Sequence, residues 1–286
     1  MSIKIVIAKY KEDISWSDIF KNERIVYEKF YDSNNKEFIR LENKGREAGT
    51  YLQFIVDNYD NLPDVTIFTQ GDPGILSNEK HGSGMGITSC EHPSDPELKK
   101  IFNFNGKFNN VDVFSKIVEN SNVVKEMGYL GITEKSPILK WDTSLNTPFP
   151  KEASHFDKFN GYGLMNCCFL RHPFDGIWAV LDLRVVYSYL FNDKIDEYYW
   201  NEGAIFAVHK DRILFHNKEF YEKALDITLN PSKFGLSDDN YLGRPIRRQE
   251  YKGYENSNTK QSMRIQSNIP HSFERLWKII FDGKTN

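Results

Sequence analysis

The sequence has few cysteines, no long apolar run and no excess of charge of one sign. Its three cysteines, Cys90, Cys167 and Cys168, form an odd and sparse set, which argues against a disulfide framework. No stretch approaches the ~18 uncharged apolar residues that a membrane-spanning helix needs. Lysine and arginine total 37 against 40 aspartate and glutamate, so no basic footprint for nucleic acid is visible. We therefore expect a cytoplasmic protein with no transmembrane segment and no nucleic-acid partner.

Several catalytic motifs are missing as well. The chain contains no P-loop, no G-x-G-x-x-G fingerprint, no G-x-S-x-G elbow and no H-E-x-x-H pair. Their absence disfavours ATPases, dehydrogenases, serine hydrolases and zincins. We find no internal repeat and no linker, and 40% hydrophobic with 27% charged residues is the profile of a folded chain. One domain spanning residues 1–286 is the favoured organisation.

The N-terminal part alternates between strand and helix signals. Residues 3–8 are a β-branched run that predicts a buried strand, and residues 24–30 and 37–41 are further strand candidates. One apolar stripe at helical spacing follows, with Asn43 or Thr50 as its expected N-cap: Ala48, Tyr51, Leu52, Ile55, Val56 and Tyr59. A strand at residues 65–69 comes next. This order favours an α/β fold with a mixed, mostly parallel sheet flanked by helices.

The rest of the chain is patterned less regularly. We expect helices over residues 111–124, 219–229 and 272–281, and a strand of small residues over 203–208. A glycine-rich segment from Pro73 to about Gly86 has the composition of a functional lid.

Polar residues follow two of the predicted strands. Tyr10, Glu12 and Asp13 come after the first strand, and residues 70–72, Gln-Gly-Asp, come after the strand at 65–69. Ligands of open α/β sheets bind beyond the carboxyl ends of the strands. If the two strands are neighbours in a parallel sheet, both groups face the same place.

Asp72 is the candidate metal ligand of this group. A single carboxylate with diphosphate oxygens and waters suits Mg²⁺ or Mn²⁺. Gly71 lets a backbone approach a phosphate, and Tyr10 is placed to stack on a base. A plain Gly-Asp-Pro turn capped by Asp72 is the competing interpretation.

Three further sites have a functional and a structural interpretation each. Arg46 opens the long helix and is either a phosphate ligand or a surface arginine. Glu202 precedes a strand and is either a general base aimed at an acceptor hydroxyl or part of a turn. His81 and His92 are candidate acid–base or metal residues of a hydrolase or phosphotransferase, with solvated loop residues as the alternative.

Blocks of the sequence resemble a family of domains of unknown function. The chain carries Y-x-E-D-x-x-W at residues 10–16, N-x-G-R-E-x-x-T-Y-L at 43–52 and F-x-Q-G-D-P at 68–73. Residues 203–208 and 274–281 are also similar to that family, whereas about 74–164 is not covered.

The layout of that family is similar to glycosyltransferases of the GT-A type, which are Rossmann-related. The resemblance implies a nucleotide-binding half over about residues 1–135 and an acceptor half over about 136–286. In it, Asp72 takes the place of the metal-binding D-x-D carboxylate, with Gln70 where the first Asp would stand. The residues implied in donor binding are Tyr10, Glu12, Asp13, Arg46, Gln70, Gly71 and Asp72.

The function expected from this resemblance is sugar transfer in polysaccharide biosynthesis. The partners would be a nucleotide-sugar donor and a glycan or other hydroxyl acceptor, with Mn²⁺ or Mg²⁺ as cofactor and Glu202 as candidate base. The alternative is a noncatalytic glycan- or nucleotide-binding protein on the same scaffold, which the missing first Asp favours.

Overall fold

The computed structural model describes part of the chain. The described residues are 1–30, 35–74, 94–133, 135–140, 186–187, 189–191, 197–201, 204–234 and 269–282. The glycine-rich segment beyond Gly74, and most of the region between residues 141 and 196, lie outside them.

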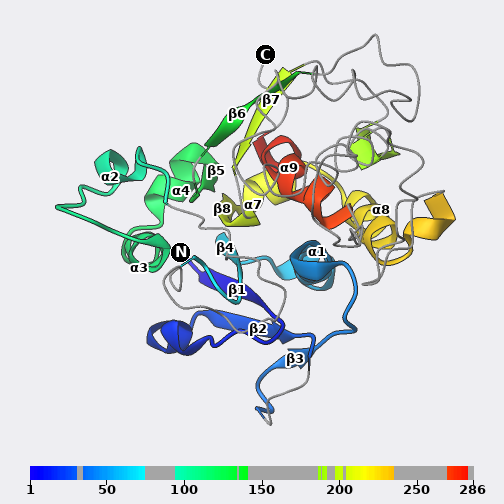
Figure 1. Cartoon of the computed structure of the whole chain (residues 1–286), viewed down its shortest axis with the longest axis horizontal. Helices are drawn as coiled ribbons and strands as arrows, with labels where there is room; N and C mark the ends of the chain where they lie inside the picture. Colours follow the sequence, from blue (N-terminus) through cyan, green and yellow to red (C-terminus); the bar gives the residue numbers. More distant parts are fainter. Residues whose placement is uncertain are drawn as a thin grey trace, which may run out of the picture.

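The described part is built around a six-stranded mixed sheet. In sheet order, its strands are β3 (Ile39–Arg40), β2 (Arg24–Glu28), β1 (Ile3–Lys9), β4 (Val65–Gln70), β8 (Phe206–His209) and β5 (Tyr129–Gly131). The first four strands are parallel, and β8 is inserted antiparallel between β4 and β5. Figure 1 shows the sheet rising from β3 at the bottom to β5 near the top. The predicted mixed, mostly parallel sheet flanked by helices is confirmed.

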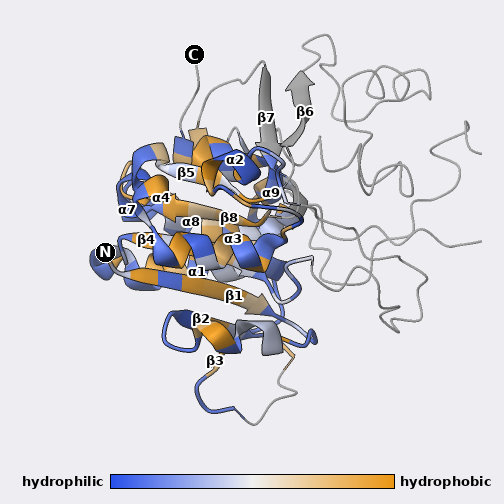
Figure 2. Cartoon of the chain, turned by 90° about the vertical axis from the view of Figure 1, so that its left-hand side faces the viewer, coloured by the Kyte–Doolittle hydropathy of each residue, from blue (hydrophilic) through white to orange (hydrophobic). Residues whose placement is uncertain are grey.

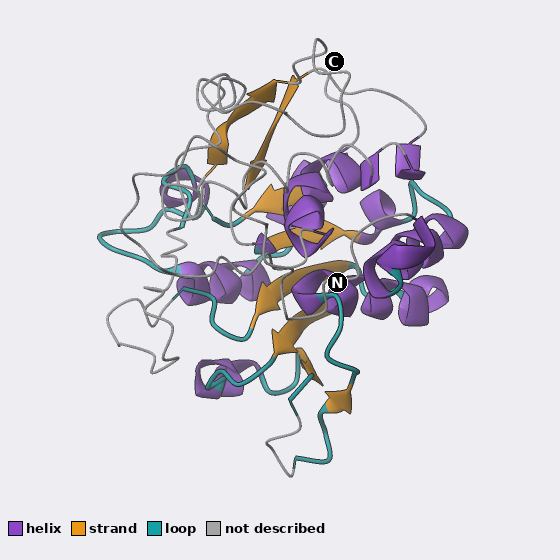
Figure 3. Ribbon diagram, turned by 45° about the vertical axis from the view of Figure 1, so that its right-hand side comes forward, coloured by secondary structure: helices purple, strands orange, loops and turns teal. Residues whose placement is uncertain are grey.

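Helices cover both faces of this sheet (Figures 1 and 3). The helices are η1 (Ser15–Phe20), α1 (Arg46–Asn58), η2 (Tyr59–Asn61), α2 (Leu98–Ile101), α3 (Asn110–Glu119), α4 (Asn122–Met127), α7 (Lys210–Ile213), α8 (Lys218–Leu229), η5 (Pro231–Phe234) and α9 (Ile269–Asp282). A separate antiparallel pair is formed by β6 (Lys135–Lys140) and β7 (Glu197–Asn201).

The two faces have separate hydrophobic cores. On one face, Phe68 and Trp277 belong to a core that α1, α8 and α9 complete. On the other face, Ile67 and Phe114 belong to a core that η1, α2, α3 and α4 complete. The central strands β1 and β4 therefore contribute apolar residues to both cores, and Figure 2 colours most of β1 as hydrophobic. Each fully buried isoleucine or phenylalanine contributes about 1.5–3 kcal/mol to folding.

The connections of the parallel strands run over opposite faces. The chain passes from β1 to β2 through η1 on one face, and from β3 to β4 through α1 on the other. The strand order therefore reverses between β1 and β4, which makes their carboxyl ends the topological switch point of the sheet. In doubly wound α/β folds ligands bind at that point.

The start of α1 differs from the prediction. Neither Asn43 nor Thr50 caps this helix: Gly45 is its N-cap residue, in the left-handed conformation at φ 64°, and no side chain caps the helix. A Cβ at Gly45 would lie 2.5 Å from Cγ2 of Thr228 on α8. The glycine is needed both for its φ and for the close packing of α1 on α8, which no local capping rule reveals.

Two later predictions also need correction. The helix expected over residues 111–124 is two helices, α3 and α4, which Asn120 and Ser121 separate. The strand expected over 203–208 begins only at Phe206. In the part of the chain that the structure describes, no helix has both the length and the apolarity to cross a bilayer.

Candidate functional site

The carboxyl ends of β1 and β4 lie side by side. Ala8 pairs with Gln70 at the end of the parallel ladder, and the amide of Gly71 donates to the carbonyl oxygen of Ala8 across 2.9 Å. The residues that follow each strand therefore start from neighbouring points of one sheet edge. This is the arrangement on which the sequence-based grouping of Tyr10 and Glu12 with residues 70–72 depends.

Glu12 joins the two strand ends. Its Oε2 accepts from the amides of Tyr10, across 2.6 Å, and of Lys11, across 3.1 Å. The same carboxylate lies against Gly71, where an added Cβ would come within 2.6 Å of Oε2. The missing side chain at Gly71 is thus explained by contact with Glu12, whether or not a phosphate also approaches this backbone.

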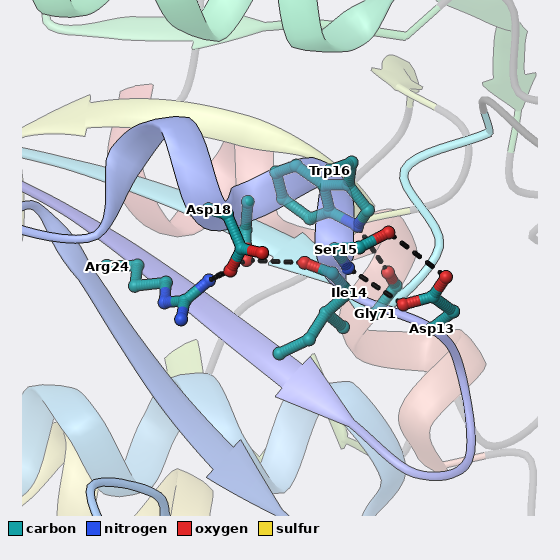
Figure 4. A network of polar contacts seen from close by, with 8 residues as sticks. Asp13, Ile14, Ser15, Trp16, Asp18, Arg24 and Gly71 are labelled. Carbon is teal, nitrogen blue, oxygen red and sulfur yellow. Dashed lines mark hydrogen bonds and ion pairs between the residues drawn. The ribbon is translucent and has the colours of Figure 1, made fainter.

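Trp16 ties the η1 helix to the end of β4. Its Nε1 donates to the carbonyl oxygen of Gly71 across 2.8 Å, a contact drawn in Figure 4. The indole packs against Phe114 and Phe20, at ring-centroid distances of 5.7 and 6.5 Å. The Trp of the first motif and the Gly of the third, 55 residues apart, therefore form one unit.

Asp13 has a local role at the start of η1. Its two carboxylate oxygens accept from the amide and hydroxyl of Ser15, across 2.9 and 3.0 Å (Figure 4). These bonds satisfy the donors of the first residue of this helix. The side chain is exposed, at the same loop as Glu12.

Asp72 sits in a turn that is held from the neighbouring α3. Its Oδ1 accepts from the amide of Gly74 across 2.8 Å, and the carbonyl of Pro73 accepts from Nδ2 of Asn110 across 2.6 Å. The hydroxyl of Ser94 donates in turn to Oδ1 of Asn110. Asp72 therefore caps this turn. Its side chain is half-buried, so part of its surface remains exposed at the switch point.

An aromatic pair stands at the ends of β1 and β2. The rings of Tyr10 and Phe30 meet edge-on at a centroid distance of 5.2 Å. The ammonium of Lys11 lies 3.9 Å from the centre of the Phe30 ring and 5.4 Å from that of Tyr10. Phe30 remains 43% exposed, although a phenylalanine normally buries its ring.

A buried ion pair lies at the last residues of β1 and β2. Lys9, the last residue of β1, contacts Oε1 of Glu28, the last residue of β2, at 3.2 Å. The Glu28 side chain is fully buried, and its Oε2 has no hydrogen-bond partner among the described residues. No pattern in the sequence indicates this pair, because charged residues at strand ends are usually exposed.

Lys29 follows Glu28 and points to the opposite face, where α1 begins. Its ammonium donates to the carbonyl of Lys44 across 2.6 Å and also to the carbonyl of Arg46. Burial lowers the pKa of Lys29 to about 8, and the neighbouring Glu47 offsets this only in part. Arg46 is thus placed at the same sheet edge as Tyr10, but beside the end of β2, with a positive φ of 45°.

The candidate base Glu202 lies outside the described residues, as do His81 and His92. The nearest described residue after Glu202 is Ala204, which has a φ of 51°. Its carbonyl accepts from the buried hydroxyl of Tyr51 on α1 across 3.1 Å. Because β8 runs antiparallel to β4, with Phe206 opposite Phe68, Ala204 lies toward the same edge of the sheet as Asp72.

A metal ion at this edge would be held partly by a bound ligand and not by protein side chains alone. Within the described ranges, no three His, Cys, Asp or Glu side chains are grouped so that they could hold a metal. Mg²⁺ is commonly held by one or two carboxylates together with substrate phosphates and waters. Asp72, which is half-buried, is the carboxylate at this edge that could hold such an ion.

Comparison with known proteins finds the N-terminal motifs but no activity. No curated protein and no solved structure matches the chain. The model of a family described as "Protein of unknown function (DUF3431)" matches residues 5–87. This range contains β1, η1, β2, β3, α1 and β4, and with them the unit formed by Glu12, Trp16 and Gly71. The N-terminal residues 5–87 are therefore similar to a family whose function is unknown.

Proposed function

We propose that this protein is a glycosyltransferase that moves a sugar from a nucleotide-sugar donor to a hydroxyl of a glycan or another acceptor. The observation that carries the proposal is the adjacency of the carboxyl ends of β1 and β4 at the switch point of the sheet. Asp72 follows the central strand β4 by two residues, and Tyr10 follows β1 by one. Switch points of this kind bind nucleotides in other α/β folds.

The donor would lie across this edge. Its diphosphate belongs beside Gly71 and Asp72, and its nucleoside beside Tyr10 and Glu12. A divalent ion held by Asp72 and the diphosphate would neutralise charge on the leaving group. The amide of Gln70 stands where a second carboxylate would be expected, and it can donate to a phosphate oxygen.

The transfer step exchanges one bond for another. The acceptor oxygen forms a bond to the anomeric carbon, the bond from that carbon to the diphosphate oxygen breaks, and the diphosphate leaves with the electron pair. In an inverting reaction, Glu202 would take the proton of the acceptor hydroxyl as general base. Arg46, at the same sheet edge beside Lys29, would attract the phosphates of the donor.

The test is an assay of donor consumption and product formation over a panel of nucleotide sugars, with and without Mn²⁺. The Asp72→Asn variant should lose transfer by about 100-fold, because a neutral amide replaces the anionic ligand. Asp60→Asn is the matched control, since Asp60 is exposed in η2, which follows α1, and the change should leave activity unchanged.

Other results would contradict the proposal. Donor binding without turnover under all conditions would support the noncatalytic binding protein instead. Activity that survives Asp72→Asn but is lost in His81→Ala or His92→Ala would point to a hydrolase or phosphotransferase.

A further inference from the structure

Phe30 is an aromatic residue just beyond β2 that belongs to none of the three sequence motifs. It follows β2 by two residues, and Tyr10 follows β1 by one. The two strands pair in register up to Lys9 and Glu28, so the residues beyond them leave the sheet together. The edge-on contact of the two rings results from this register.

Neither ring of the pair belongs to the hydrophobic cores of the described residues. Phe30 is 43% exposed although Tyr10 and Lys11 contact it. The backbone of the two residues that contact the ring is held by Glu12, which accepts from the amides of Tyr10 and Lys11. A phenylalanine side chain has only two rotatable bonds, so it loses little conformational entropy when a flat ligand stacks on it.

The Lys11 ammonium, which lies over the Phe30 ring, indicates the class of ligand. The ammonium of Lys11 lies 3.9 Å from the centre of the Phe30 ring, and the Lys11 side chain is exposed to solvent. An aromatic face next to a lysine matches a flat, uncharged ring joined to an anionic group. A nucleotide has both parts, whereas a neutral sugar has no anion for the lysine to attract.

We propose that Phe30, Tyr10 and Lys11 form the nucleoside subsite of this edge, in which the nucleobase takes the place of the Lys11 ammonium over the Phe30 ring and Lys11 contacts a phosphate. The inference rests on the proposed function for the presence of a nucleotide donor, and it adds Phe30 and Lys11 to the residues that bind it. Stacking of a base on an aromatic side chain is sequence-tolerant, so the subsite selects for a base without choosing one.

The experiment is isothermal titration of the full chain with uridine, adenosine and guanosine diphosphates, inorganic pyrophosphate and a free hexose. Phe30→Leu keeps an apolar side chain but removes the aromatic face. It should weaken the binding of the nucleoside diphosphates by about tenfold and leave pyrophosphate unchanged. Lys11→Met should weaken nucleoside diphosphates and pyrophosphate together. Thermal unfolding of each variant checks that the fold is retained.

The control variants are Phe215→Leu and Lys125→Met. Phe215 is 73% exposed in the turn between α7 and α8, and Lys125 is exposed on α4. Neither should change any affinity.

The outcomes separate the subsite from the transferase. Equal affinity of wild type and Phe30→Leu for nucleoside diphosphates, or tighter binding of the hexose than of the nucleotides, would overturn the subsite. Failure of the wild type to bind any nucleotide would overturn it as well. If the variants behave as expected and no sugar is ever transferred, the subsite stands and the proposed function fails.

Discussion

The indole nitrogen of Trp16 donates to the carbonyl oxygen of Gly71 across 2.8 Å, and this bond fastens the β1–β2 connection to the end of β4. Glu12 lies against the same glycine. The chain segment that carries Asp72 at the end of β4 is therefore positioned by Trp16 and Glu12. Both belong to the first motif, which follows β1 on the other side of the switch point.

Replacing Trp16 by phenylalanine should destabilise the protein through this bond. The variant leaves the Gly71 carbonyl without its donor while it keeps an aromatic ring against Phe114. We expect the free energy of unfolding in urea to fall by about 1–2 kcal/mol. Ile19→Ala, in the same η1 helix but 69% exposed, should change it by less than about 0.5 kcal/mol. A Trp16→Phe variant as stable as the wild type would contradict the bond.

Gly71→Ala should destabilise the protein, because the new side chain would collide with Glu12. The new methyl group would lie 2.6 Å from Oε2 of Glu12, so the carboxylate must leave the amides of Tyr10 and Lys11. We expect a loss of about 1–3 kcal/mol in the free energy of unfolding.

A double-mutant cycle checks the cause. Glu12→Ala opens the space that the methyl group needs, so Glu12→Ala with Gly71→Ala should cost less than the sum of the single changes. The interaction energy should be about 1 kcal/mol. Strictly additive losses would show that the two residues do not share this contact.

Removing one member of the buried ion pair of Lys9 and Glu28 should destabilise the protein strongly. Replacing both by apolar residues should destabilise it much less. Lys9→Met leaves the carboxylate of Glu28 buried without its cation, which should cost about 3–5 kcal/mol. Lys9→Met with Glu28→Leu should recover most of that loss, since no buried charge remains. The exposed pair of Lys116 and Glu119 is the control, and Lys116→Met should cost about 0.5 kcal/mol at most. Similar losses at the two sites would contradict the burial argument.

Lys29 should give the protein a measurable dependence of stability on pH. Its pKa in the folded state is about 8, below the ordinary value near 10.4, chiefly because the ammonium is buried. Between these two values the unfolded chain binds more protons than the folded chain. The free energy of unfolding should therefore rise with pH above about 8, by at most about 1.4 kcal/mol per pH unit.

The comparison with Lys29→Met isolates this effect from the other titrating groups. The variant should lack the rise between pH 8 and 9.5, whereas Lys125→Met, which removes an exposed lysine, should keep it. A wild type whose stability relative to Lys29→Met is constant over this range would contradict a lowered pKa at Lys29.

Local signals predicted most of the elements but not how they are joined. The apolar stripe from Ala48 to Tyr59 predicted α1, and the β-branched runs predicted β1 and β4, since each pattern follows from burial of one or both faces. The antiparallel insertion of β8 between β4 and β5 was not predicted. β8 is far from β4 and β5 in the sequence, so its pairing with them depends on the whole sheet. No local sequence pattern predicts such a pairing.

The candidate site was predicted in part for the same reason. The grouping of Tyr10 and Glu12 with Asp72 required only that two predicted strands be neighbours, which they are. The bond from Trp16 to Gly71 and the exposure of Phe30 depend on tertiary packing, so their residue types alone gave no signal. Glu202 lies outside the described residues and stays a prediction.

The central claim is that Asp72 faces a nucleotide site at the carboxyl ends of β1 and β4. A crystal of the full chain grown with Mn²⁺ and a nucleoside diphosphate tests it directly, because manganese gives an anomalous signal that locates the ion. We expect one strong peak at the carboxylate of Asp72, with the diphosphate beside Gly71. An ordered nucleotide or manganese ion bound elsewhere on the protein, with the Asp72 carboxylate contacting neither, would contradict the account.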